Sequence, residues 1–156
     1  MNYKNVLGID PGAGGAWVYI EDIDGANLIR TSFFPSETPL SILSMFSELD
    51  IKQTYCVLEH VWGRPTDGGS RAFNFGRNYG LIEMSLHSLN AFVDYVTPQS
   101  WLRYMALGNV DGRTKTEWKN SLKNEAKELF PKQKITLKNA DAFLIAEFAK
   151  RKLLNK

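Results

Sequence analysis

The chain contains 156 residues, of which 44% are hydrophobic and 23% are charged, and its formal net charge is +2. This length and composition predict one globular domain with a sizeable core, and a charge this close to zero does not by itself point to any partner. No apolar run approaches the roughly 20 residues that a membrane-spanning helix needs, and the first residues lack a secretory signal. The single cysteine, Cys56, excludes an internal disulfide. We therefore expect a cytoplasmic protein.

The order of the predicted elements indicates a mixed α/β fold in a single domain, 1–156. Apolar and β-branched runs predict strands at 5–9, 16–21 and 28–34, and Asp24-Gly25 supplies the turn between the last two. Helices and strands then alternate: helix 39–49, strand 53–58, helix 73–90, strand 92–96, helix 98–105, a helix that starts at the capping box Thr114-Lys115-Thr116-Glu117 and ends before Pro131, and helix 140–154. This order predicts a five-stranded sheet, antiparallel in its first three strands, flanked by helices.

Three isolated acids lie at the tips of predicted elements. Asp10 ends the first strand before a glycine-rich turn, Glu59 ends the fourth strand, and Asp141 opens the last helix. Ligands bind at strand ends where the topology of such a sheet switches, so Asp10 and Glu59 meet if the first and fourth strands are neighbours. Taken alone, Asp10 could equally be an ordinary turn residue. Taken alone, Asp141 could be an acid of the kind favoured in the first turn of a helix. Together, the three acids predict a metal site.

These motifs resemble those of a known nuclease family. Gly8-Ile9-Asp10-Pro11-Gly12, then Glu59 at a strand end, then the segment 139–146 resemble the RuvC-type Holliday-junction resolvases of the ribonuclease-H-like superfamily. The aromatic and glycine-rich segment 73–80 is typical of the divergent phage branch, so the cell would be bacterial or phage-infected. The resemblance implies a homodimeric endonuclease of DNA recombination and repair. Its substrates would be four-way junctions and related branched DNA, which it would cut with paired nicks.

The resemblance also implies a set of metal ligands. Asp10, Glu59 and Asp141 would bind two Mg²⁺ ions, with Mn²⁺ able to substitute, and such ions activate water and stabilise the leaving oxygen in phosphodiester hydrolysis. Bacterial relatives carry a further acid three residues before the final aspartate, where this chain has Lys138. Either the site works with three acids, or Lys138 contacts the scissile phosphate and partly replaces one metal ion as a catalytic residue.

Six residues are candidates for contacts with DNA. Trp62 lies three residues beyond Glu59, where the resemblance implies an aromatic side chain that stacks on bases at the junction centre; the alternative is a tryptophan packed under its own loop. The basic candidates for phosphate contacts are Arg64, Arg71, Arg77, Lys115 and Lys119. The two lysines belong to a stripe that is more often a solvated helix face.

Two questions stay open at this level. The first is the dimer interface, for which we expect the apolar side chains of the helix 73–90, namely Leu81, Met84, Leu86 and Leu89. The second is the function, for which there are two alternatives. A fragment of an actin-like phosphotransferase also begins with a strand, an acid and glycines, but such enzymes need two domains around the nucleotide. A non-catalytic protein that binds branched DNA would not require all three acids.

Overall fold

The computed structural model describes residues 3–12, 14–25, 27–34, 39–62, 68–108, 110 and 112–155. Five strands form one sheet in the order β3-β2-β1-β4-β5: β1 (Asn5–Asp10), β2 (Ala16–Glu21), β3 (Leu28–Phe33), β4 (Thr54–Glu59) and β5 (Phe92–Val96). The first three strands pair antiparallel, whereas β4 runs parallel to both β1 and β5. The predicted mixed five-stranded sheet is therefore confirmed, including the contact between the first and fourth strands.

Within the described residues, five α-helices and one 3₁₀ turn connect and cover these strands: α1 (Pro39–Ser47), η1 (Ile51–Gln53), α2 (Gly69–Ser88), α3 (Pro98–Tyr104), α4 (Lys115–Leu129) and α5 (Ala140–Leu154). The capping box at Thr114 is confirmed, with both of its reciprocal hydrogen bonds present. The helix α2 begins four residues earlier than predicted, because its glycines weaken the sequence signal but do not end the helix. None of the helices in the described part of the chain is long and apolar enough to span a membrane.

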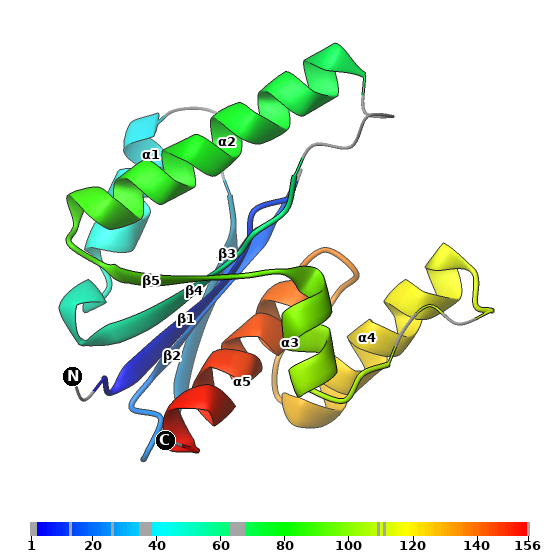
Figure 1. Ribbon diagram of the computed structural model, residues 1–156. Helices are drawn as coiled ribbons and strands as arrows, with labels where there is room; N and C mark the ends of the chain where they lie inside the picture. Colours follow the sequence, from blue (N-terminus) through cyan, green and yellow to red (C-terminus); the bar gives the residue numbers. More distant parts are fainter. Residues whose placement is uncertain are drawn as a thin grey trace.

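Helices cover both faces of the sheet, as Figure 1 shows, with α1 and α2 on one face and α3, α4 and α5 on the other. Because side chains alternate along a strand, β1 contributes to two separate cores. Leu7 and Ile9 pack with the helices α1 and α2, whereas Val6 packs with α5. The residues of β1 with even numbers therefore face α5, and Asp10 is one of them.

Gly8 allows α5 to lie directly against the sheet. A Cβ atom at Gly8 would come within 2.6 Å of the Cα of Ala146 and 2.8 Å of the carbonyl oxygen of Ala142, distances that real side chains do not adopt. Both of those atoms belong to the backbone of α5 and cannot move aside without shifting the helix. The absence of a side chain at this position therefore sets how closely α5 approaches β1.

We expect Gly8→Ala to destabilise the fold by more than about 3 kcal/mol, because a rigid helix backbone leaves the added methyl group no room. Urea unfolding followed by circular dichroism measures this cost. The matched control is Gly80→Ala on α2, where an added Cβ meets nothing within 4 Å and alanine should stabilise the helix by about 0.5–1 kcal/mol. Equal stabilities of the two variants would show that α5 does not depend on this close approach.

Candidate metal centre

Two of the three predicted acids are brought together by strand pairing. The strands β1 and β4 run parallel with Ile9 opposite Leu58, so Asp10 and Glu59 follow side by side at the same edge of the sheet. Side chains alternate along β4, so Glu59 lies on the same face of the strand as Tyr55 and Val57. Those two side chains pack in the core under α5. Both carboxylates consequently project from the sheet on the side that α5 covers.

The first turn of α5 supplies the third acid. Asp141 is the second residue of that helix and is buried. The chain that leads into it is fixed by Asn139, which is also buried and whose Oδ1 accepts a hydrogen bond from the backbone N–H of Thr136 at 2.7 Å. Asp141 interacts electrostatically with both Asp10 and Glu59. The structure therefore brings together the three acids that the sequence singles out.

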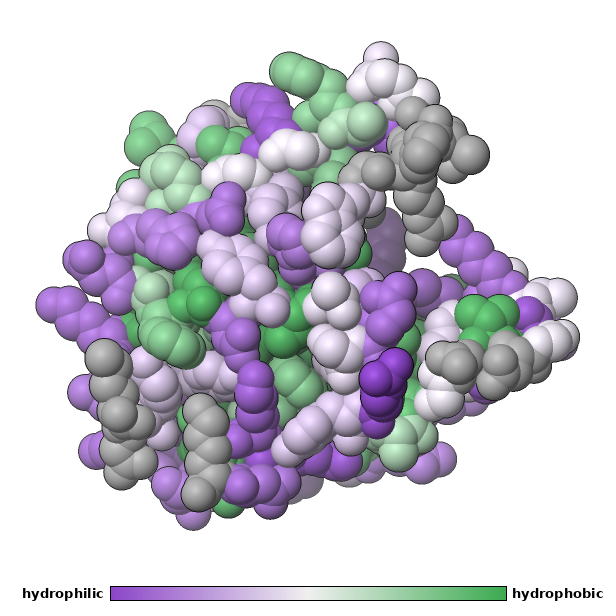
Figure 2. All heavy atoms as spheres, viewed as in Figure 1, coloured by the Kyte–Doolittle hydropathy of each residue, from purple (hydrophilic) through white to green (hydrophobic). Residues whose placement is uncertain are grey.

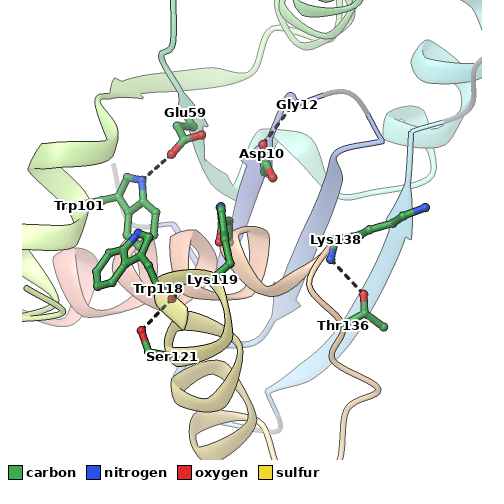
Figure 3. A network of polar contacts seen from close by, with 10 residues as sticks. Asp10, Gly12, Glu59, Trp101, Trp118, Lys119, Ser121, Thr136 and Lys138 are labelled. Carbon is green, nitrogen blue, oxygen red and sulfur yellow. Dashed lines mark hydrogen bonds and ion pairs between the residues drawn. The ribbon is translucent and has the colours of Figure 1, made fainter. Parts of the chain in front are cut away.

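Each carboxylate has a different partner (Figure 3). Asp10 Oδ1 accepts a hydrogen bond from the backbone N–H of Gly12 at 2.9 Å, which ties the acid to the turn after β1. Glu59 Oε1 accepts a hydrogen bond from the indole Nε1 of the buried Trp101 at 2.8 Å. Asp141 Oδ2 forms an ion pair with the ammonium group of Lys119. The other oxygen of Asp141, Oδ1, is buried and has no hydrogen-bond partner among the residues described.

Burial and mutual repulsion make the two strand acids hard to ionise. Burial, reinforced by the carboxylate of Asp141, raises the pKa of Asp10 from 3.8 to about 6, against the opposing effects of the Gly12 N–H and of Lys119. Burial and the neighbouring Asp10 raise the pKa of Glu59 from 4.5 to about 7, although the hydrogen bond from Trp101 acts in the opposite direction. A bound cation would remove this penalty, because it favours the ionised form of nearby carboxylates.

The donors fit a hard divalent cation, but they do not form a closed cage. In the parts of the chain that the structure describes, no three His, Cys, Asp or Glu side chains lie close enough together to share one ion. Mg²⁺ prefers oxygen ligands and usually takes only one or two carboxylates, with water and substrate phosphates as its other ligands. An unpartnered buried carboxylate oxygen on Asp141, beside Asp10 and Glu59, suits such an open site.

The lysine inside the acidic cluster is Lys119, not Lys138. Figure 3 shows the side chain of Lys119 rising from α4 toward Glu59 and Asp10, while that of Lys138 extends away from the cluster. Lys138 is exposed, and its backbone N–H donates to the hydroxyl of Thr136 at 3.3 Å. The side chain of Lys119 is 38% exposed and that of its partner Asp141 only 12%. The structure therefore places Lys119, which we predicted as a DNA contact, among the candidate metal ligands.

The residues predicted to contact DNA differ in their exposure and in their contacts with other side chains. Trp62 is 69% exposed, and its ring meets the ring of His60 edge-on at 4.4 Å between centroids. His60 is held in turn by a 3.0 Å hydrogen bond between its Nδ1 and the hydroxyl of Tyr79 on α2. Arg71 and Arg77 are exposed on α2, Lys115 is exposed at the start of α4, and Arg64 lies outside the described residues.

The expected dimer surface is only partly available for contacts with another molecule. Leu86 is completely buried in the core beneath α1 and α2, so the prediction that it contributes to an interface was wrong. Leu81 and Leu89 are partly buried and pack against the same core. Met84 is 47% exposed. Of these four side chains, Met84 is therefore the one that offers a substantial apolar surface.

Sequence reasoning did not identify Trp101 as part of the site. The strand β5 ends at Val96, which pairs with Glu59, and the short helix α3 follows immediately. This connection places the indole N–H beside the Glu59 carboxylate. A tryptophan five residues beyond a strand carries no functional signal in itself, and its role becomes visible only once β5 is known to lie beside β4.

No protein-family model and no curated protein matches this sequence. Solved structures with a similar fold do exist, and two of them are RuvC from Thermus thermophilus, alone and in complex with a Holliday junction substrate. The structure of RuvC alone has a TM-score of 0.60 and covers 97% of this chain and 95% of its own. The complex has a TM-score of 0.65 and covers 98% and 95%, and sequence identity is 14% in both cases. The predicted ribonuclease-H-like fold of the RuvC type is therefore confirmed.

We expect the stability of the protein without metal, measured with a chelator present, to fall as the pH rises. The pKa values of Asp10 and Glu59 are about 6 and about 7 in the folded chain, above their ordinary values. The folded state therefore holds protons that the unfolded state releases, and this stabilisation is complete below about pH 4 and is lost as the pH rises through 6 and 7. Asp10→Asn should flatten the profile, whereas Asp24→Asn in the exposed β2–β3 turn should not. Parallel profiles for the wild type and Asp10→Asn in urea unfolding would contradict this assignment.

Proposed function

We propose that the protein is a metal-dependent endonuclease that resolves four-way DNA junctions and related branched DNA. The observation that supports this most directly is the convergence of Asp10, Glu59 and Asp141 at one edge of a sheet of the RuvC type. Three acids from distant parts of the sequence would be costly to bury together without a catalytic or ligand-binding purpose. A similar fold has been solved with a Holliday junction substrate.

In this proposal the acidic cluster holds the catalytic metal. Divalent cations held by the three carboxylates would activate water and stabilise the leaving oxygen of the phosphodiester. The protein's own contribution is orientation: the N–H of Gly12 fixes Asp10, and the indole of Trp101 fixes Glu59. The catalytic role predicted for Lys138 stays a prediction: its exposed side chain is directed away from the cluster, so contact with the scissile phosphate would require the side chain to turn.

The surroundings of the cluster suit an extended polyanion. The site lies at the edge of the sheet, with α2 on one side of the sheet and α4 on the other, and Figure 2 shows the end of α4 standing out from the body of the molecule. We assign phosphate contacts to Arg71 and Arg77 on α2 and to Lys115 on α4, all of which are exposed. Trp62 would stack on bases at the junction centre, with its ring braced by His60.

The working unit in this proposal is a two-fold dimer. A four-way junction needs two cuts in strands of like polarity, and one acidic cluster cuts one strand at a time. An isologous interface supplies the second cluster from the same gene product. The face of α2 that carries the exposed Met84 is our candidate for that interface.

One observation favours the alternative of a non-catalytic protein that binds branched DNA. Lys119 already neutralises Asp141, as a cation would in a site that never binds metal. One assay distinguishes the two proposals. The purified protein is incubated with a four-way junction or with linear duplex, each with and without Mg²⁺. Paired nicks in the junction alone, together with light scattering that gives two chains per junction, would support the resolvase. Tight binding without any cleavage would support the alternative.

We expect Asp10→Asn, Glu59→Gln and Asp141→Asn each to abolish cleavage and to leave junction binding intact. Each change removes one negative charge from the cluster with little change of shape, and the loss should exceed about a hundredfold in rate. Gel assays on one labelled junction measure binding and cleavage separately. The control is Asp24→Asn, which removes an exposed carboxylate in the β2–β3 turn. Near-normal cleavage by any of the three variants would remove that residue from the proposed site.

We expect Trp62→Ala to weaken binding to four-way junctions much more than binding to linear duplex. Loss of one base–aromatic stack costs about 1–3 kcal/mol, or roughly 5- to 150-fold in affinity. The melting temperature should hardly change, because the side chain is largely exposed. Leu28→Ala, at an exposed apolar position near the other end of the sheet, is the control. An equal loss of affinity for both DNAs would argue against stacking at the junction centre.

A further inference from the structure

Lys119 occupies an unusual position for a helix-surface lysine. It begins on α4, reaches across to α5, and pairs with Asp141, while also interacting electrostatically with Asp10 and Glu59. Among the residues that the structure describes, no other basic side chain forms an ion pair with any of these three acids. Figure 3 shows its stem directed from α4 toward Glu59 and Asp10. The ammonium group thus lies where a positive charge is needed most.

The charges of the cluster explain why the lysine is held there. Burial by itself would lower the pKa of Lys119, but the carboxylates of Asp141, Asp10 and Glu59 outweigh it and raise that pKa, so the side chain stays charged. When all three carboxylates are ionised, the ammonium group of Lys119 still leaves two net negative charges in a largely buried site. The lysine relieves part of the repulsion among the acids in the absence of metal.

We propose that Lys119 is a built-in counter-ion that competes with the divalent cation for the carboxylate of Asp141. This inference rests on the proposed function, because it takes the acidic cluster as the metal site. Oδ1 of Asp141 is unpartnered and can accept a cation while Lys119 stays, but the two positive charges then repel each other, and binding through Oδ2 requires Lys119 to leave. The protein's affinity for metal is therefore set partly by its own lysine.

The side chain is suited to such an exchange. A lysine has a flexible four-carbon stem and a compact charge, so it can swing away without disturbing the helix that carries it. Its side chain is 38% exposed, which gives the displaced ammonium a path to water. Once displaced, the ammonium group remains beside the cluster, where the phosphate of a substrate would arrive. Lys119 would then serve as a positioning residue for DNA after it has given up Asp141.

The test measures metal binding without DNA and without turnover. Isothermal titration with Mg²⁺ compares the wild type with Lys119→Met, which keeps the stem and removes the charge. We expect Lys119→Met to bind Mg²⁺ at least about tenfold more tightly, to melt at a lower temperature without metal, and to gain more from added Mg²⁺. Lys127→Met, at an exposed position on the same helix, should match the wild type. Unchanged or weaker Mg²⁺ binding by Lys119→Met would overturn the proposal.

Two further measurements keep the outcomes separate. Asp10→Asn tests the metal site itself: if it binds Mg²⁺ as the wild type does, the proposed function loses its metal centre, whatever Lys119 does. If Lys119→Met does not fold, the displacement of Lys119 can still be tested on the wild-type protein. Its lysines are ¹³C-methylated and followed by NMR during a Mg²⁺ titration. A shift of the Lys119 resonance, identified with Lys119→Arg, would support displacement. A resonance unmoved at saturating Mg²⁺ would overturn it.

Discussion

The parallel pairing of β1 with β4 is the constraint on which the rest of this structure depends. Its register sets Ile9 opposite Leu58, so the next residue of each strand is an acid at the same edge of the sheet. A slip of one residue would turn one of the two carboxylates to the opposite face. The buried runs on both strands prevent such a slip, because every apolar side chain would then change cores. Packing in the core thereby fixes the geometry of the site.

The third acid depends on the same strand through Gly8. The helix α5 can bring Asp141 over the sheet edge only because the position two residues before Asp10 has no side chain. Gly8 and Asp10 point to the same face, so one strand provides both the contact for the helix and the acid that the helix completes. The opening motif Gly8-Ile9-Asp10 can therefore be understood physically, since its glycine and its aspartate serve a single arrangement of strand and helix.

The sequence predicts the sheet well and singles out the three acids, because both follow from local pattern. Buried strands appear as apolar runs, and an isolated acid at the end of such a run stands out. It predicts partners between elements poorly. The lysine stripe on α4 recurs every four residues, and nothing local shows that Lys119 is the one that lies beside Asp141. Trp101 is a similar case, because its contact with Glu59 requires both the β4–β5 pairing and the short helix that follows.

Lys119 and Lys138 also bear on how many cations the proposed metal site would need. The resemblance noted in the sequence implies a fourth acid where this chain has Lys138, so three carboxylates remain here. If all three are ionised, Lys119 neutralises one of them, and one divalent cation would balance the two charges that remain. A second cation would meet a neutral site and make it net positive, unless Lys119 leaves and a phosphate brings further negative charge. Under the proposed function, charge balance would thus couple binding of a second cation to the arrival of DNA and would keep the centre inactive until its substrate is bound.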